Sequence, residues 1–412
     1  MKLAIISDTH FGHPDCNLVI DGPGSPQVGA RYEQFKNIAG TDNDYLVLVG
    51  DILDFALSDY SVAYKCGKCF FEQIILDRVI NKNTDIIYIP GNHDGDIWHI
   101  IQHQRHIINR IGPHGIFPEK FQHSVAGILD DRAGSVSKGL TLNKVTPRPP
   151  QPGVHKYSGM FLDKLTDPET HFNFAYPNLY LVTDTGECVL ISHGHYFEPY
   201  WSFLGEFTMD IAYDDLGHPN PDADISMEEK TDLNFPLNQL ACTGVGQAGI
   251  FSERIVTPVE EQPEKVKKYF SRLTNAKETL GLSWLTLKAI QWLFQSDVVD
   301  ALNNKTRFRD DWVADPKVKQ RGVKFFESSL LEIDEINKSN NFNLPHPQRL
   351  IIGHTHQPIA WNDPDPPDFG SFSDKKVTWH NTGGWIEKNR QFCGAEVFVY
   401  ETGKGMSSHS VK

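Results

Sequence analysis

The chain has 412 residues, a formal net charge of -14 and a hydrophobic content of 39%. This length is ample for a buried core and suggests two or three domains, or one domain with large insertions. The negative charge argues against a nonspecific nucleic-acid binder, because polyanions are repelled. A small phosphorylated substrate stays compatible with this charge, since bound metal ions reverse the local field.

The cysteines and the apolar segments indicate in which cellular compartment the protein is expected. Six cysteines are too sparse and irregular for a disulfide framework, which favours a reducing environment. The N-terminus opens with Lys2-Leu3-Ala4-Ile5-Ile6, a buried-strand pattern rather than a signal peptide. No apolar stretch approaches the roughly 20 residues that span a bilayer. We therefore expect a soluble cytoplasmic protein with no transmembrane segment.

Five short apolar runs each end in a cluster of polar residues. In chain order they are Leu3 to Ile6 before Asp8-Thr9-His10, Tyr45 to Val49 before Gly50-Asp51, Ile86 to Ile89 before Gly91-Asn92-His93-Asp94, Cys188 to Ile191 before His193-Gly194-His195, and Leu350 to Ile352 before Gly353-His354-Thr355-His356. Such runs predict buried strands. Polar residues just past strand ends are typical of open α/β sheets, which bind ligands at their carboxyl edge.

Helical patterns alternate with the first strands, around Arg31 to Ile38 and Phe70 to Ile80, and this alternation predicts an α/β fold. The later part of the core looks more antiparallel. Leu179 to Thr183 and the run from Cys188 read as a β-hairpin, and Val377 to His380 and Glu396 to Tyr400 read as strands without intervening helices. Two facing sheets fit this pattern.

Two long insertions separate the core pieces. We expect core at 1–94, a first insertion at 95–178, a core hairpin at 179–202, a second insertion at 203–346 and core again at 347–412. Helical patterns at Ile97 to Ile111, Glu264 to Asn303 and Val318 to Ile336 fall in the insertions. Together the insertions are expected to form a mainly helical cap above the strand ends.

The polar clusters together form a candidate metal-ligand set. Its members are Asp8, His10, Asp51, Asn92, His193, His354 and His356. The set mixes carboxylate oxygen with imidazole and has no thiolate, which suits Mn²⁺, Fe or Zn²⁺. An aspartate has two oxygens and a full charge, so it can bridge two adjacent ions.

The order of these motifs resembles that of the calcineurin-like metallophosphoesterase superfamily, over about half of the chain. The resemblance implies a four-layer αββα sandwich and two divalent transition-metal ions, with Mn²⁺ as the first choice. The ligands that it implies for one ion are Asp8, His10, Asp51 and His356. Those that it implies for the other are Asp51, Asn92, His193 and His354, with Asp51 as the bridge and His193 preferred to His195.

The resemblance also places His93 near the phosphate and the leaving oxygen, as a transition-state stabiliser or general acid. Asp94 is a candidate to orient His93, as carboxylates often orient histidines. A water that bridges two ions becomes hydroxide near neutral pH and can attack phosphorus in line. The implied activity is metal-dependent hydrolysis of a phosphoester or pyrophosphate bond, as in a phosphatase or phosphodiesterase.

Three further residues are candidates for substrate contact. His13 follows His10 and could touch phosphate, or it is a solvated loop histidine. His195 falls within reach of the metals in the family picture. Asn381 opens Asn381-Thr382-Gly383-Gly384-Trp385, which resembles a segment of relatives that hydrolyse the pyrophosphate bond of a UDP-linked lipid precursor; a tight turn with a packed tryptophan is the other interpretation.

Two alternative functions stay open on sequence grounds. A non-catalytic scaffold can keep this fold, although here no ligand position is degraded. A nuclease can share it too, although the acidic charge and the lack of a basic, aromatic-interleaved stretch count against that. The sequence does not identify the small phosphorylated substrate, the native metals or the oligomeric state.

Overall fold

The computed structural model describes most of the core and part of the insertions. It describes residues 1–81, 84–111, 115–132, 143–145, 162, 165–166, 170–198, 201–202, 204–206, 225–239, 241–243, 247, 315–372, 375–388, 391–392 and 394–412. The helix expected at Glu264 to Asn303 lies outside these residues. Within them, no helix is both long enough and apolar enough to cross a membrane.

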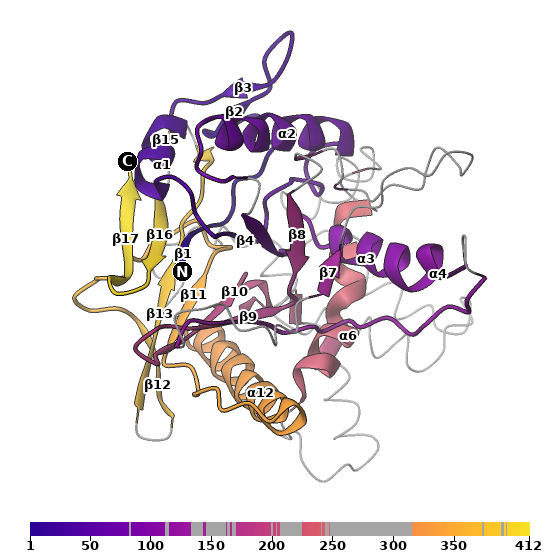
Figure 1. Cartoon of the computed structure of the whole chain (residues 1–412), viewed down its shortest axis with the longest axis vertical. Helices are drawn as coiled ribbons and strands as arrows, with labels where there is room; N and C mark the ends of the chain where they lie inside the picture. The colour runs from indigo at the N-terminus through magenta and orange to yellow at the C-terminus, as the bar shows by residue number, and fades with distance from the viewer. Residues whose placement is uncertain are drawn as a thin grey trace, which may run out of the picture.

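The first sheet has seven strands in the order β17-β16-β1-β4-β5-β8-β7 (Figure 1). Their bounds are β1 Lys2–Ile6, β4 Tyr45–Val49, β5 Asp85–Ile89, β7 Asn143–Val145, β8 His171–Phe174, β16 Ala395–Glu401 and β17 Gly405–Val411. Strands β1, β4, β5 and β8 are parallel, whereas β16 pairs antiparallel with β1. The sheet is therefore mixed, with its parallel part built by the first half of the chain.

The second sheet has six strands in the order β12-β13-β11-β10-β9-β6. Their bounds are β6 Gly127–Asp130, β9 Asn178–Val182, β10 Cys188–Ser192, β11 Arg349–Ile352, β12 Asp368–Phe372 and β13 Lys375–Asn381. The expected hairpin is confirmed as β9 and β10, and β10, β11 and β13 run parallel. Two small ribbons complete the strands: β2 (Val19–Ile20) with β3 (Gln27–Val28), and β14 (Glu387–Lys388) with β15 (Gln391–Phe392).

Alternate side chains of each strand enter different cores, as the two-residue period of a strand requires. Leu3 and Ile5 of β1 join a buried cluster with Leu181 and Ile191 of the second sheet, so the two sheets face each other. Ile6 points the other way, into a cluster with helix residues.

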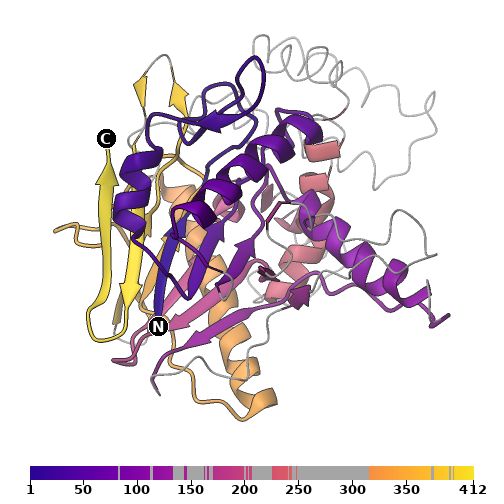
Figure 2. The same cartoon turned by 45° about the horizontal axis from the view of Figure 1, so that its top comes forward.

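Helices cover the outer faces of both sheets. Helices α1 (Tyr32–Ala39) and α2 (Tyr60–Leu76) lie over the first sheet, and α12 (Pro316–Asn340) lies along the second (Figures 1 and 2). The predicted α/β fold of two facing mixed sheets between helical layers is confirmed.

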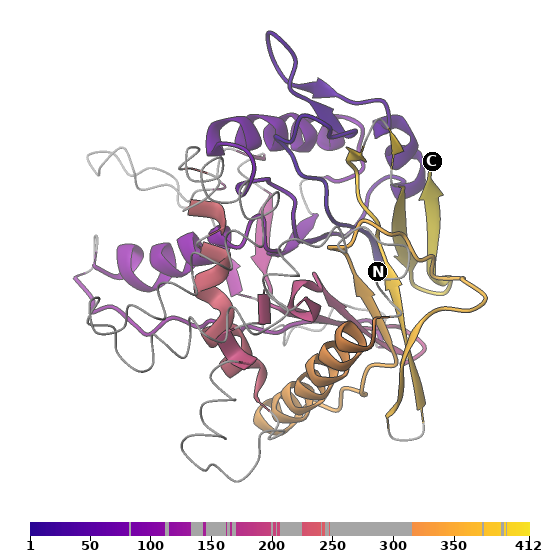
Figure 3. The ribbon, with the colours of Figure 1, turned by 180° about the vertical axis from the view of Figure 1, so that it is seen from behind.

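The first insertion departs from expectation. The stretch 95–178, expected as cap, supplies β6, β7 and β8 to the two sheets. Its helix is α3 (Asp96–His103), which continues as a π-helical turn η1 (Gln104–Ile108) and α4 (Asn109–Ile111). From the second insertion, α6 (Met227–Gln239) packs against α3 (Figure 3).

Helix α2 also differs from the sequence prediction, beginning at Tyr60 rather than Phe70. Asp59 is its N-cap, and the side chain accepts a hydrogen bond from Val62 N at 2.9 Å. The helix ends at Leu76, well before the predicted end at Ile80. The cap provides a clear start signal that the apolar run alone does not contain.

Candidate metal centre

The seven predicted metal ligands come together at the carboxyl ends of strands from both sheets. Asp8 and His10 follow β1, Asp51 follows β4 and Asn92 follows β5; His193 follows β10, and His354 and His356 follow β11. All seven are buried, with exposed fractions of at most 7%. In the described part of the chain, three His/Asp groups have ligand atoms close enough to share an ion: Asp8 with His10 and His356, His10 with Asp51 and His93, and Asp51 with His193 and His354.

At one end of the site, electron-pair donors face each other. His10 Nδ1 lies 3.1 Å from the Asp54 carboxylate, so in the neutral form of the ring, which is the form that binds a metal, Nδ1 would carry the proton and Nε2 the lone pair. Nε2 lies 3.1 Å from His356 Nε2, and His356 Nε2 lies 3.3 Å from Asp8 Oδ1. Two imidazole nitrogens and a carboxylate oxygen at these separations fit the ligand shell of a divalent ion.

The other end of the site repeats this arrangement around His193. Its Nδ1 donates to the Val49 carbonyl at 2.8 Å, which leaves the Nε2 lone pair pointing inward. Nε2 lies 3.1 Å from Asn92 Oδ1 and 3.3 Å from Asp51 Oδ2. Three acceptors that face one another at this distance favour a cation between them. Asp51 belongs to two of the three groups, as a bridging ligand would.

Glycines let the ligand loops approach closely enough for this geometry. A Cβ on Gly91 would lie 2.7 Å from Asp51 N and 2.8 Å from His193 Nε2. A Cβ on Gly384 would lie 2.7 Å from the His356 ring. All three distances are shorter than ordinary contacts, so a larger residue at either position would push ligands apart.

The carboxylates and imidazoles of the site shift the pKa values of one another. Burial opposes ionisation of Asp51, yet His193 and His93 hold its pKa well below its usual range. Burial likewise opposes the charged form of His193, but Asp51 raises the pKa to about 10. Burial also opposes the charged form of His10, but the Asp54 carboxylate outweighs this effect and raises the pKa of His10 to about 9. Protons thus compensate the carboxylates where a divalent ion would otherwise do so.

His93 is held by Asp54 and not by Asp94. Its Nδ1 lies 2.9 Å from Asp54 Oδ1, and its backbone N donates to Asp51 Oδ1 at 2.7 Å. The role expected for Asp94 is therefore wrong. Its carboxylate accepts hydrogen bonds from Ile52 N at 2.8 Å, from Gly91 N at 2.6 Å and from the Tyr88 hydroxyl, which ties the loops after β4 and β5 together.

The side-chain amide of Asn381 is hydrogen-bonded to neighbouring loop residues. Its Nδ2 donates to the Gly353 carbonyl and to Thr355 Oγ1, both at 2.9 Å, and its Oδ1 accepts from Gly383 N at 2.8 Å. The amide is fully used and 1% exposed. Because Gly353 and Thr355 flank His354, Asn381 positions that loop. The turn interpretation of the segment is the one that fits, with Trp385 buried.

His13 and His195 lie beside the centre in different settings. His13 is half-buried, its ring centroid is 6.4 Å from that of His10, and burial lowers its pKa. His195 is 1% exposed, with its ring centroid 5.5 Å from that of His193. Burial, with His193 and His354, lowers the pKa of His195 well below its usual value. Neither of its ring nitrogens has a hydrogen-bond partner among the described residues.

Two carboxylates at the site were missed by sequence reasoning. Asp54 follows Asp51 by three residues, and this spacing after a strand end was the available signal. Glu198 lies 3.3 Å from His354 Nε2 and is 7% exposed. Only the fold brings Glu198 to His354, so no local pattern could have found it.

The second insertion reaches the loop that carries His93. Cys242 Sγ donates to the His93 carbonyl at 3.2 Å. Gln247 Nε2 donates to the carbonyls of Phe55 and Ser58 at 3.0 and 3.1 Å, and its Oε1 accepts from Tyr60 N at 3.2 Å. Insertion residues thus hold the segment just after Asp54.

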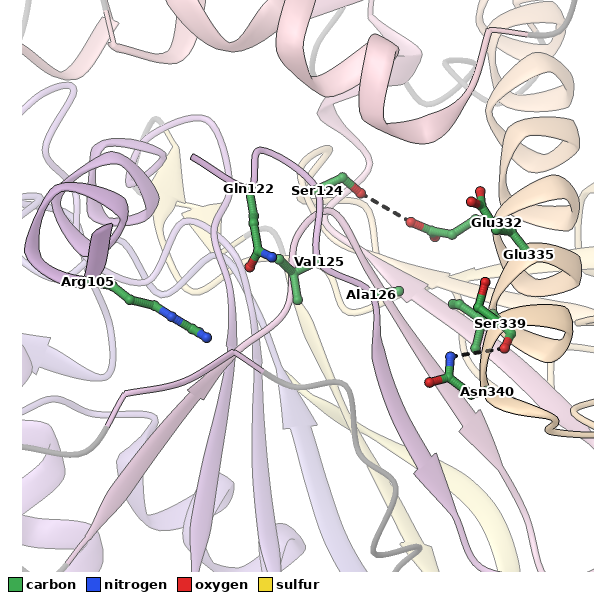
Figure 4. Close-up of a pocket in the computed structure, with 10 residues that line it drawn as sticks. Arg105, Gln122, Ser124, Val125, Ala126, Glu332, Glu335, Ser339 and Asn340 are labelled. Atoms are coloured by element: carbon green, nitrogen blue, oxygen red, sulfur yellow. Dashed lines mark hydrogen bonds between the residues drawn. The ribbon is translucent and has the colours of Figure 1, made fainter. Parts of the chain in front are cut away.

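A separate groove of about 370 Å³ lies between η1, the segment 122–126 and α12 (Figure 4). Arg105 extends toward it from one side, and Glu332 and Glu335 line the other. No predicted metal ligand lines this groove. It is therefore distinct from the metal centre.

Comparison with known proteins adds one match. Residues 1–215 match the family model for the calcineurin-like phosphoesterase. The matched segment contains five of the seven ligand positions, and His354 and His356 lie beyond it. No curated protein matches the chain.

Proposed function

The chain belongs to the calcineurin-like phosphoesterase family, and we propose that it is a binuclear metal-dependent hydrolase of a phosphoester or pyrophosphate bond. The observation that carries this proposal is Asp51, which lies within ligand reach of His10 on one side and of His193 and His354 on the other. A single-metal protein has no need for a carboxylate shared in this way. An intact ligand set also distinguishes the chain from a scaffold that only keeps the fold.

We assign the ligands of the two ions as the family resemblance implies. One ion is held by Asp8, His10, Asp51 and His356, and the other by Asp51, Asn92, His193 and His354. The mixed oxygen and nitrogen donors suit Mn²⁺ first, with Fe or Zn²⁺ as alternatives. When bound, the ions would acidify a water and neutralise charge on a phosphoryl group.

The chain's own groups contribute proton handling and orientation. Asp54 holds Nδ1 of His93, so Nε2 is the nitrogen that can donate to a phosphoryl or leaving oxygen. The side chain of His93 is 14% exposed, whereas that of Asp54 is fully buried. The imidazole can thus meet a substrate while its carboxylate partner stays protected from water.

We propose a small phosphorylated substrate, with His13 and His195 beside it, and a cytoplasmic location. His195 supports this because both of its buried ring nitrogens lack partners among the described residues, and such atoms cost free energy unless something binds them. The five described cysteines are free thiols, which fits a reducing compartment.

The test compares wild type with Asp51→Asn, loaded with Mn²⁺, on p-nitrophenyl phosphate and its bis-ester. Asp51 has φ +54°, which asparagine adopts readily, so the fold is retained. We expect a loss of at least about 10²-fold in kcat and close to two metal ions per wild-type chain by elemental analysis.

Asp59→Asn is the matched control, because asparagine caps α2 as well as aspartate does. Equal inactivity of wild type and Asp51→Asn on a broad phosphoester panel, with each of the three metals, would overturn the enzyme proposal.

A further inference from the structure

Glu198 brings an additional carboxylate against one of the candidate metal ligands. Its Oε2 lies 3.3 Å from His354 Nε2, and the residue is 7% exposed. We propose that Glu198 is a positioning residue that holds the Nε2–H of His354 and so fixes Nδ1 as the metal-binding nitrogen. This inference rests on the two-metal site proposed above.

The backbone around Glu198 is held from both sides. Gly194, at φ +98°, turns the chain after His193 into the short helix η2 (His195–Phe197). Glu198 N then donates to the His195 carbonyl at 3.0 Å. The Glu198 carbonyl accepts from Ser202 Oγ, also at 3.0 Å. The carboxylate therefore sits on a fixed segment and not on a free loop.

The neighbours of His354 indicate which nitrogen faces the metal. Its buried Nε2 makes no hydrogen bond with any described residue, Glu198 included, and the Glu198 carboxylate 3.3 Å away is the ion-pair partner that could accept a proton from it. The ligand group that includes His354 contains Asp51 and His193, and no metal-sized group of described residues contains Glu198. Glu198 thus lies behind the imidazole and not among the ligands.

Two other candidate ligands, His10 and His193, have outer support of this kind. His10 has Asp54 behind it, and His193 has the Val49 carbonyl. Histidine ligands that donate their second nitrogen in this way have a fixed tautomer, and a carboxylate partner also makes the imidazole more basic. For His354 the supported nitrogen is Nε2 instead of Nδ1, so this ring would bind the metal through Nδ1, whereas His10 and His193 would bind it through Nε2.

The experiment measures metal binding without substrate. Metal-free wild type, Glu198→Gln and Glu198→Ala are titrated with Mn²⁺, and free Mn²⁺ is followed by electron paramagnetic resonance. Loss of an outer-shell partner typically weakens metal affinity by about 10–100-fold. We expect Glu198→Ala to weaken binding of one of the two ions by this factor, and Glu198→Gln, which keeps an oxygen acceptor, to weaken it less. Both variants should still bind two ions at saturation.

Glu332→Gln is the matched control, since this glutamate accepts from Asn178 Nδ2 and the Tyr180 hydroxyl and touches no metal candidate. Wild-type affinity in both Glu198 variants would overturn the proposal. Loss of one whole equivalent at saturating Mn²⁺ would also overturn it, because Glu198 would then be a ligand. A wild type that binds two ions but hydrolyses nothing defeats the proposed activity alone.

Discussion

Asp54→Asn is the sharpest perturbation of the proposed chemistry, because one carboxylate serves two histidines. Asp54 Oδ2 contacts His10 Nδ1 at 3.1 Å, and Oδ1 contacts His93 Nδ1 at 2.9 Å. An asparagine can accept one of these protons at most, and its NH₂ group then faces the other ring and favours the wrong tautomer. The substitution should therefore weaken both a metal ligand and the candidate general acid.

The magnitude follows from these two contacts. Loss of the outer partner of a metal histidine costs about 10–100-fold in metal affinity. Loss of a positioned acid–base group costs about 10²–10⁴-fold in rate, or ~2.7–5.4 kcal/mol in the activation barrier. At saturating Mn²⁺ only the second effect remains, so kcat should fall by about 10²-fold or more on a poor leaving group.

The assay compares a p-nitrophenyl ester with an alkyl ester of the same phosphate. A p-nitrophenolate leaves without protonation, whereas an alkoxide needs a proton. If His93 donates that proton, Asp54→Asn should slow the alkyl ester much more than the p-nitrophenyl ester. Equal slowing of both esters at saturating Mn²⁺ would refute the acid role of His93, and unchanged rates would refute the role of Asp54 altogether.

Two further predictions concern residues outside the ligand set. Asn381→Ala should lower the free energy of unfolding by ~2 kcal/mol or more, measured by calorimetry, because it leaves buried partners such as the Gly353 carbonyl unsatisfied; a raised KM with unchanged stability would instead mean substrate contact. Burial raises the pKa of Glu332, so the folded state holds this proton more tightly and stability falls as pH rises from about 4.5 through the raised pKa. In urea unfolding at pH 4.5–7, Glu332→Gln should show a smaller fall than wild type; parallel curves would contradict this.

The strands and the ligand set could be predicted because both have local signals. The strand from Tyr45 to Val49 is found at the predicted bounds, because a continuous run of five apolar residues is typical of a strand that is buried on both faces of a sheet. The polar residues after each strand meet because parallel strands place their carboxyl ends together. His10, Asp51 and His193 are all found where this rule predicts.

The remaining features depend on contacts between distant segments. The stretch 95–178 contains strands of three or four residues, such as β8 (His171–Phe174), which are too short to stand out beside its helix. Asn381 and Glu198 both support the loop or the ring of His354, and both lie more than 25 residues from His354 in the sequence. Their contacts with it therefore follow only from the order of the strands in the sheet. Asp94 was misassigned because its nearest histidine in sequence is not its partner in space.

Five of the seven ligand positions have left-handed backbones. They are Asp8 (φ 51°), His10 (φ 47°), Asp51 (φ 54°), His354 (φ 69°) and His356 (φ 57°). None is a glycine, and each such residue costs roughly 1–3 kcal/mol unless its surroundings hold it. The cost is offset by side-chain to backbone contacts, such as His354 N on both Asp8 oxygens at 2.9 Å. Glycine would relieve this strain at the five positions but would remove the ligand, so the strained backbone is retained there together with the metal donor that it orients.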